Sequence, residues 1–324
     1  MPSALRTLAV ALGLVVACAS LAAGETYPTR PVRIIAPFPA GGPVDVLARA
    51  TGEELARTLG QPVIIENKPG AGGNIGADVV AKADPDGYTL LMTSPGIQSI
   101  NQFLYRTMPF DPEQAFAPIS LVADMPMLVV VHPKLNVKTL AELIARARAQ
   151  PGRLTFGSAG IGTTGHLGQA LLTHVAGINL THVPYRGAAP SVTDLIAGQI
   201  DGVVDNPPTV MSHIRAGSIL PLAVAGKDRL TILSDVPTAA EAGLPGWQAS
   251  SWFGLAAPAG TPRAVVERLH DAVAQAVKRP AMQRFTAEAG ARIFATSPEA
   301  FAQVIRDDRA KWGEIIKAAK IAAD

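Results

Sequence analysis

Short apolar segments with the composition of β-strands alternate with helical patterns along almost the whole chain, and this alternation restricts the fold more than any other feature. Val32–Ala36 reads as a strand, small residues follow it, and a helical pattern begins at Pro43, where the missing N–H of proline leaves no helical hydrogen bond unmade. The same order returns at Leu154–Phe156, the glycine loop Gly157–Gly165 and a helix expected from Thr164. The alternation predicts an α/β fold of parallel sheets with helices on both faces.

The same reading gives the remaining elements. Further strands are expected at residues 62–66, 88–93, 119–131, 181–184, 202–205, 220–225 and 252–257. Further helices are expected at residues 74–82 and 191–197 and after the caps Thr139, Thr261 and Ser297. In sheets of this kind ligands bind beyond the carboxyl ends of the strands, so the loops at those ends are the first places to search for a site.

Length and charge narrow the class of protein. The chain has 324 residues, of which 48% are apolar and 17% charged, and its formal charge is +2. A chain of this length corresponds to about two domains of roughly 150 residues each. The nearly balanced charge, without a block of like charges, offers no electrostatic footprint for nucleic acid.

Residues 1–24 have the pattern of a secretory signal peptide, with one arginine, an apolar run and small residues before a cleavage site. We therefore expect an exported protein in the periplasm. The single cysteine, Cys18, lies inside this leader, so the mature chain is expected to have no disulfide and no thiolate site. Val15–Cys18 resembles a lipobox, which makes a lipid anchor at Cys18 the alternative to its removal with the leader.

The glycine loop contains a literal match to the dinucleotide fingerprint G-x-G-x-x-G, at Gly160–Gly165. That fingerprint needs an acidic residue about 20 positions further on to bind the ribose, and the chain has no Asp or Glu between Glu142 and Asp194. A P-loop is equally incomplete, because Thr163 stands where its lysine belongs. An NAD-linked oxidoreductase using this loop stays as the alternative function.

Other kinds of catalytic or metal site find little support. Ser158 lies near glycines but out of register with G-x-S-x-G, and the six histidines contain no H-x-x-x-H pair. We therefore predict no catalytic residue, no metal and no cofactor. An exported hydrolase with Ser158 as its nucleophile remains a rival that a Ser158→Ala variant would test.

The surviving interpretation is an anion site made by the backbone. Glycines let main-chain N–H groups approach a ligand, and the helix that follows presents unpaired N–H groups and a positive dipole end. The chain repeats this junction at Phe38–Gly42, ends another strand at Ser94, and ends a fourth at Asp205, which offers a carboxylate to an ammonium or hydroxyl group. Asp45, in the first helical turn, is expected to complement the helix dipole. A single small carboxylate suits such a site better than a polyphosphate.

With these segments assembled, the chain resembles the Bug receptors, extracytoplasmic solute-binding proteins of tripartite tricarboxylate transporters. The matching segments occur in order over nearly the whole mature chain: Tyr27–Arg33, Pro37–Asp45, Glu66–Asn74, Asp84–Leu90, Gly157–Leu167, Val183–Gly187, Val236–Thr238, Glu241–Gly243, Trp252–Gly254 and Pro258–Pro262. One departure is Gly168-Gln169-Ala170, where the resemblance leads us to expect an acid.

The resemblance implies a type II periplasmic binding protein fold, with two α/β lobes joined by crossing strands near residues 119–131 and 220–226 and the ligand between them. The expected divisions are 1–24 for the signal peptide, 25–123 with 227–324 for lobe 1, and 124–226 for lobe 2. The expected protein is a monomer and not an enzyme, and it gives a small carboxylate or dicarboxylate, amino acids and aromatic acids included, to a membrane transporter or a sensor.

The candidate ligand-binding residues come partly from the loops themselves and partly from the resemblance. They are Phe38, Pro39, Ala40, Gly41, Gly42, Ser94, Ser158, Gly160, Gly162, Thr163, His166 and Asp205.

Overall fold

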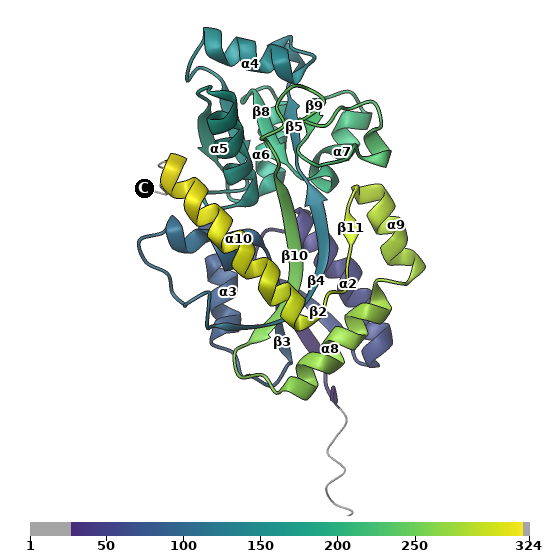
Figure 1. Cartoon of the computed structure of the whole chain (residues 1–324). Coiled ribbons are helices and arrows are strands. Elements are labelled where there is room, and N and C mark those ends of the chain that lie inside the picture. Colours follow the sequence, from purple (N-terminus) through teal and green to yellow (C-terminus); the bar gives the residue numbers. More distant parts are fainter. Residues whose placement is uncertain (1–26, 320–324) are drawn as a thin grey trace, which may run out of the picture.

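The computed structural model describes residues 27–319, so the expected signal peptide and Cys18 lie outside the described residues. The described chain forms two α/β lobes, each built on its own sheet (Figure 1). This is the two-lobed architecture that the sequence predicts.

The first lobe contains a six-stranded sheet in the order β11-β4-β10-β3-β1-β2. Its strands are β1 (Val32–Ala36), β2 (Val63–Asn67), β3 (Thr89–Thr93), β4 (Phe116–Pro126), β10 (Ser250–Pro258) and β11 (Arg292–Ile293). Its helices are α2 (Pro43–Leu59), α3 (Asn74–Ala81), α8 (Arg263–Ala276), α9 (Pro280–Ala289) and α10 (Pro298–Ala319). Three short helical turns, η2 (Ala71–Gly73), η3 (Gly96–Ile100) and η4 (Asn101–Phe103), complete it.

The second lobe contains a five-stranded sheet in the order β7-β6-β8-β5-β9. Its strands are β5 (Leu128–Val131), β6 (Thr155–Ser158), β7 (Thr181–Pro184), β8 (Gly202–Asp205) and β9 (Leu220–Val224). Its helices are α4 (Leu140–Ala149), α5 (Thr164–Ala176), α6 (Ala188–Ile196) and α7 (Pro207–Arg215), with the short turns η5 (Pro133–Leu135) and η6 (Thr231–Leu233).

The sheets are mixed, so the prediction of parallel sheets is confirmed for only some of the strands. Strands β1, β2 and β3 pair in parallel, as do β6, β7 and β8, but β4, β10, β11, β5 and β9 all pair antiparallel. The antiparallel strands include those where the chain passes from one sheet to the other. A strand that enters from the neighbouring lobe, and not from a helical crossover, has no need to run parallel to its neighbour.

The two lobes are joined where three chain segments meet. Met127 N donates to Ala249 O at 3.1 Å, Ala225 N donates to Met127 O at 2.8 Å, and Ala249 N donates to Ala225 O at 3.0 Å. The long strands β4 and β10 pair side by side and lead into this junction (Figure 1). Within residues 27–319, the backbone connection between the two sheets is therefore limited to these three chain segments.

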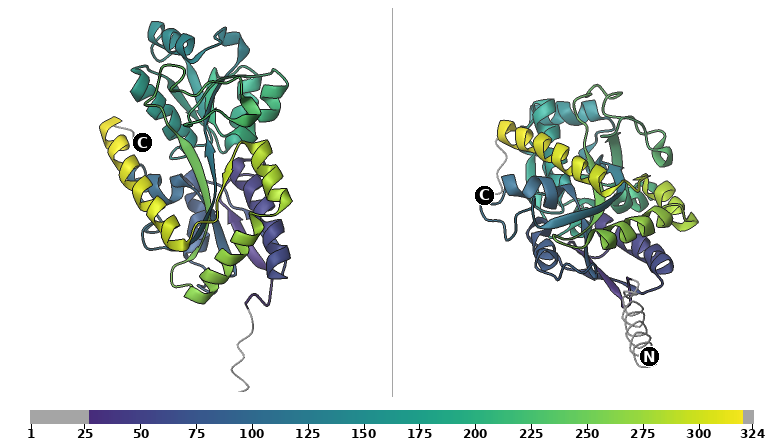
Figure 2. Two further views of the ribbon diagram at one scale, coloured as in Figure 1. Left: turned by 45° about the vertical axis from the view of Figure 1, so that its right-hand side comes forward. Right: turned by 60° about the horizontal axis from the view of Figure 1, so that its bottom comes forward.

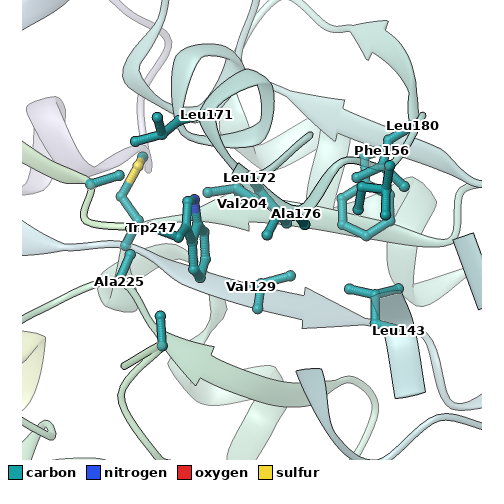
Figure 3. Close-up of a cluster of buried hydrophobic side chains, with 14 of the residues drawn as sticks. Val129, Leu143, Phe156, Leu171, Leu172, Ala176, Leu180, Val204, Ala225 and Trp247 are labelled. Carbon is teal, nitrogen blue, oxygen red and sulfur yellow. The ribbon is translucent and has the colours of Figure 1, made fainter. Parts of the chain in front are cut away.

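Each sheet is covered on both faces, because successive strand residues belong to different apolar clusters. In β5, Leu128 and Val130 pack on one side, while Val129 and Val131 pack on the other. Figure 3 shows the second of these clusters around Trp247, whose indole N–H donates to Gly168 O at 2.8 Å. The segment after β9 thus packs onto the second lobe before the chain returns to the first lobe through β10. The division of the chain into lobes after residues 123 and 226 remains a prediction.

Helix α10 lies across both lobes (Figures 1 and 2). It begins beside β4 in the first lobe, and its later residues Trp312 and Ile316 are buried in the same apolar cluster as Leu167 of α5. The last helix therefore braces the helix that follows the Gly157–Gly165 loop.

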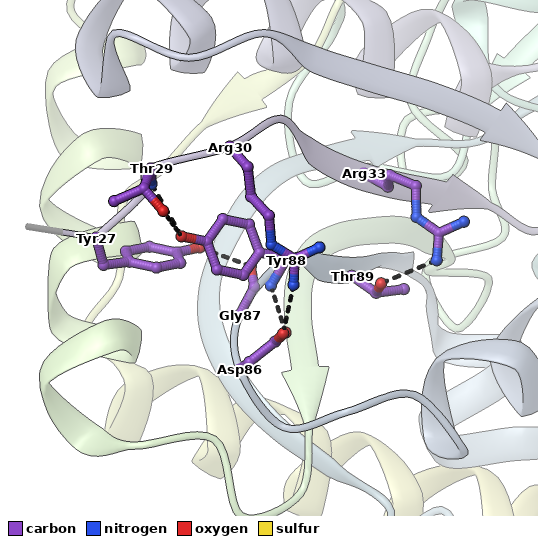
Figure 4. A network of polar contacts seen from close by, with 8 residues as sticks. All are labelled: Tyr27, Thr29, Arg30, Arg33, Asp86, Gly87, Tyr88 and Thr89. Atoms are coloured by element: carbon purple, nitrogen blue, oxygen red, sulfur yellow. Dashed lines mark hydrogen bonds and ion pairs between the residues drawn. The ribbon is translucent and has the colours of Figure 1, made fainter. Parts of the chain in front are cut away.

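Two segments that the resemblance singles out meet at the far end of the first lobe (Figure 4). Tyr27 Oη donates to Gly87 O at 2.6 Å, and Arg30 donates to Asp86 at 2.8 Å while its guanidinium lies 4.1 Å from the centre of the Tyr88 ring. These contacts fix the start of the described chain against β3, remote from the junction of the lobes.

Candidate functional site

A cleft lies between the lobes, at the carboxyl ends of strands from both sheets. It contains about 610 Å³ of space free of protein atoms, part of it open to solvent. The first lobe contributes Phe38, Pro39, Ala40, Gly42, Pro43, Val44, Ser94 and Phe253; the second contributes Ala159, Thr163, Thr164, Gly165, Ala188, Ala189, Val204, Asp205 and Asn206.

Loop 38–42, between β1 and α2, is held by an ionic network. Gly41 has φ +83°, and its N–H donates to Asp45 Oδ2 at 2.9 Å. The buried Asp45 carboxylate also pairs with Arg49 at 2.9 Å and accepts from Asn67 Nδ2 at 2.9 Å, while that amide donates to Phe38 O at 2.9 Å. Burial raises the pKa of Asp45, but the bonds from Arg49, Gly41 and Asn67 outweigh it and hold the pKa below its usual value. Asp45 therefore acts mainly by fixing the loop.

Loop 157–163, between β6 and α5, is held by neutral groups. Ser158 Oγ accepts from Gly160 N at 3.1 Å and lies 2.6 Å from His182 Nε2. The ring of His166 stacks on that of His182 with centroids 4.1 Å apart, and Gly162 N donates to His166 Nδ1 at 3.3 Å. Thr163 caps α5 by accepting from His166 N, as its place before the helix predicts.

Both histidines of this loop network are neutral near neutral pH. Burial, followed by the neighbouring His182 ring, lowers the pKa of His166 to about 3. Burial lowers the pKa of His182 to about 4. The two rings therefore shape the loop without adding positive charge beside the cleft.

Two further helix starts reach the cleft, which sequence analysis did not include in the site. Ala188 and Ala189 open α6 after Gly187, whose φ is +145°, and Asn206 is the N-cap residue of α7. Within the described chain, α2, α6 and α7 have no capping hydrogen bond from the N-cap side chain. The signal in the sequence is a third strand–glycine–helix junction, in which Pro190 follows Gly187 in the first helical turn.

Asp205 ends β8 in the wall of the cleft. Its side chain is 9% exposed, and its Oδ1 accepts from Asn206 N at 2.7 Å. Burial raises the pKa of Asp205 to about 7, against the opposing effect of the Asn206 N–H. Among the described residues that line the cleft it is the only one with an ionisable side chain.

The lobes touch each other directly at the edge of the cleft. Tyr105 Oη, from the first lobe, donates to Ile161 O of the second lobe at 3.1 Å. Gly162, with φ +78°, lies so close to Asn101 that a Cβ there would be 2.1 Å from Asn101 Oδ1. The two lobes are therefore closed on each other, and loop 157–163 contacts η2 and the turns after β3.

The predicted ligand residues fall into three groups. Seven line the cleft: Phe38, Pro39, Ala40, Gly42, Ser94, Thr163 and Asp205. Gly160 lines an adjoining cavity that also includes Tyr185 and Arg186. The remaining four line neither the cleft nor the adjoining cavity: Gly41, Ser158, Gly162 and His166. They take part in the hydrogen bonds that hold the backbone of the two loops.

Residues 27–319 contain no group of three or more His, Cys, Asp or Glu side chains placed to hold a metal ion. Within the same range, no helix has the length and apolar character needed to cross a membrane.

Comparisons with known proteins agree with this geometry. Residues 47–321 match the model of the tripartite tricarboxylate transporter family receptor, TctC. Protein BugT of Bordetella pertussis is 37% identical over 316 residues, covering 96% of this chain and 97% of that protein. The structure of Rhodopseudomonas palustris Rpa4515 with adipate has a TM-score of 0.89 at 39% identity, covering 91% of this chain and 99% of that one. The structure of MatC (Rpa3494) from the same organism with bound malate has a TM-score of 0.85 at 33% identity, covering 90% and 100%.

Proposed function

The chain belongs to the tripartite tricarboxylate transporter receptor family, and from this premise we propose that it captures a small carboxylate between its lobes and delivers it to a membrane transporter. The observation that carries the proposal is the convergence of helix starts on one cleft. The first residues of α2, α5 and α6 all line it, and among its described lining residues none is Arg, Lys or His. An anion is then bound by oriented main-chain N–H groups and hydroxyls.

Such a site is strong enough for a receptor. A helix start contributes typically about 0.3–1 kcal/mol, and up to about 2 when partly buried. Hydrogen bonds contribute about 1 kcal/mol each, and those to a charged oxygen more. Three partly buried helix starts with the hydroxyls of Ser94 and Thr164 bring the total to roughly −8 kcal/mol, which corresponds to micromolar affinity.

Two relatives support the class of ligand. Structures similar to this chain hold adipate and malate, which are both dicarboxylates. Apolar side chains such as Phe38, Val44 and Phe253 line part of the cleft, and they provide a surface for the hydrocarbon part of an aliphatic or aromatic acid.

The proposed setting is the periplasm, reached through the expected signal peptide, with the protein acting as a monomer. Similar structures are of periplasmic proteins. Presentation of the loaded form to a sensor protein is the alternative use of the same binding event, because hinge closure produces one surface for either partner.

We infer a receptor and not an enzyme. Ser158 Oγ and His182 Nε2 are within hydrogen-bond distance, as in a nucleophile–base pair, but Ser158 is 3% exposed and does not line the cleft. Tyr105 and Asn101 of the other lobe contact the Gly160–Gly165 loop at Ile161 and Gly162, which leaves little room for a pyrophosphate at these residues.

Isothermal titration calorimetry on ligand-free, refolded mature protein tests this function. We expect saturable micromolar binding of at least one small carboxylate and no binding of NAD or NADH. Native mass spectrometry of the freshly purified protein identifies any retained acid directly. Saturable nicotinamide binding with no carboxylate binding would overturn the proposal.

A further inference from the structure

Asp205 is an unusual group for an anion site. Its carboxylate carries the same sign of charge as the proposed ligand, yet it lies in the wall of the same cleft. A charged side chain that is nine-tenths buried must find hydrogen-bond partners or a compensating charge to offset its lost hydration.

The protein itself supplies only part of that compensation. Asp205 Oδ1 accepts from Asn206 N at 2.7 Å, and within the described chain no hydrogen bond reaches its other oxygen. That oxygen lies on a side chain lining the cleft, so a bound molecule is the group placed to satisfy it.

Charged groups on the surrounding elements do not fill this role. Asp45 and Arg49 of α2 are paired with each other, and Arg186 lines the adjoining cavity. His166 of α5 and His182 of β7 are neutral in the range around pH 7. Among its described lining residues, the cleft thus contains one fixed acid with no fixed cation beside it.

The charge balance then discriminates between ligands. Besides the negative charge of Asp205, a simple monocarboxylate brings one further negative charge into the cleft, and a dicarboxylate brings two. A carboxylate that also carries an ammonium group brings no net charge, and its N–H groups form charge-assisted bonds to Asp205.

We propose that the ligand is an amino carboxylate whose ammonium group binds Asp205, and that Asp205 selects it over mono- and dicarboxylates that lack the amine. This rests on the proposed function, because the helix starts must still hold the carboxylate.

Because Asp205 titrates, the proposal predicts the direction in which ligand affinity changes with pH. Since burial raises the pKa of Asp205 to about 7, the side chain loses its charge between about pH 8 and about pH 6. An ammonium ligand needs the ionised form, so its affinity falls by about tenfold over that interval. A ligand without the amine prefers the protonated form, so its affinity rises as the pH falls.

The experiment is calorimetric titration of the ligand-free mature protein at about pH 8 and about pH 6. The probes are short-chain α- and ω-amino acids, with amine-free mono- and dicarboxylates of the same chain lengths. The variants are Asp205→Asn, in which the amide oxygen can still accept from Asn206 N, and Asp235→Asn, which makes the same charge change at an exposed position.

We expect an amino acid to bind tightest, to weaken about tenfold at the lower pH and to weaken at least about tenfold in Asp205→Asn, with Asp235→Asn unchanged. Tightest binding by an amine-free acid, strengthening at the lower pH, would overturn the role of Asp205 and leave the carboxylate receptor intact. Binding of no acid at all would overturn the proposed function itself. The pH arm uses the unaltered protein, so it decides the question even if Asp205→Asn fails to fold.

Discussion

The loop of residues 38–42 and the loop of residues 157–163 have the same order of strand, glycines and helix, but different chemistry holds them. In the first loop a buried carboxylate, Asp45, accepts from Gly41 N and pairs with Arg49. In the second, a serine and two stacked neutral histidines hold Gly160 and Gly162. In both loops side chains of the same lobe accept the glycine N–H groups, and in neither loop do the titratable side chains that hold it line the cleft.

Loop 157–163 also makes contacts between the lobes that loop 38–42 does not make. Ile161 and Gly162 touch Tyr105 and Asn101 across the gap between the lobes. Under the proposed function, ligand binding and lobe closure depend on the same few residues of loop 157–163. The first loop is fixed within its own lobe, apart from the approach of Pro39 to Gly187.

The largest effect is expected from Gly162→Leu. The new side chain needs a left-handed backbone and places its Cβ 2.1 Å from Asn101 Oδ1, so the closed state is lost and affinity falls by about 100-fold or more. Calorimetry with the best-binding acid measures this, and secretion should be almost unchanged.

Gly217→Leu is the matched control for that variant. Gly217 has a similar φ of +72°, but no heavy atom lies within 4 Å of its added Cβ. Both variants carry the left-handed strain of about 1–2 kcal/mol in unfolding experiments, while only Gly162→Leu loses affinity. Wild-type affinity in Gly162→Leu would show that loop 157–163 is not part of the closing contact.

The order of strand, glycines and helix at the two loops was predictable, because it depends on residues that are close together in the sequence. The predicted and observed bounds coincide for the strands Val32–Ala36 and Gly202–Asp205, and helix α2 begins at the predicted residue, Pro43. Each has an apolar or amphipathic pattern of the right length and a breaking residue soon after its end, such as Gly60 with φ +71° after α2.

The contacts that hold the loops were not predictable, because they join residues distant in the sequence. Nothing near Ser158 indicates that His182 will face it, and the pairing of β6 with β7 brings them together. Asp45 looks like a residue that complements the helix dipole, and only the fold reveals Asn67 beside it. The same holds for the antiparallel pairing of β4 with β10, which depends on where the chain changes lobes.

A smaller effect is expected from acid, and it separates the two loops. An unfolded histidine has a pKa of about 6.5, whereas burial lowers the pKa of His166 to about 3 in the fold. Below pH 6.5 the unfolded chain binds a proton that the folded chain does not, so stability falls as the pH falls, by up to about 1.4 kcal/mol per pH unit. The His166→Phe variant lacks this imidazole. Between pH 7 and pH 5 its free energy of unfolding, measured with urea, should therefore decrease by about 2 kcal/mol less than that of the wild type.

Asp45→Asn is the opposite case. Because the pKa of Asp45 lies below its usual value in the fold, the stability it contributes is present above the ordinary aspartate pKa of about 3.9 and is lost only as the pH falls through the lowered value. Its stability difference from the wild type should therefore be constant between pH 7 and pH 5. An equal pH dependence for both variants would contradict the distinction between an ionic and a neutral loop support.

The smallest effect is expected from Tyr105→Phe, which removes one hydrogen bond between the lobes. A bond from a neutral hydroxyl to a carbonyl contributes about 0.5–1.5 kcal/mol, so affinity should fall by roughly 2- to 10-fold while the helix starts that we propose to bind the carboxylate stay in place. Tyr27→Phe is the control, because Tyr27 Oη also donates to a carbonyl, that of Gly87, but this bond lies inside the first lobe (Figure 4) and neither residue lines the cleft. If both variants lose stability and only Tyr105→Phe loses affinity, the second loop is the one that couples ligand to closure. Equal affinities for the two variants would instead place the control of closure at the hinge around Met127.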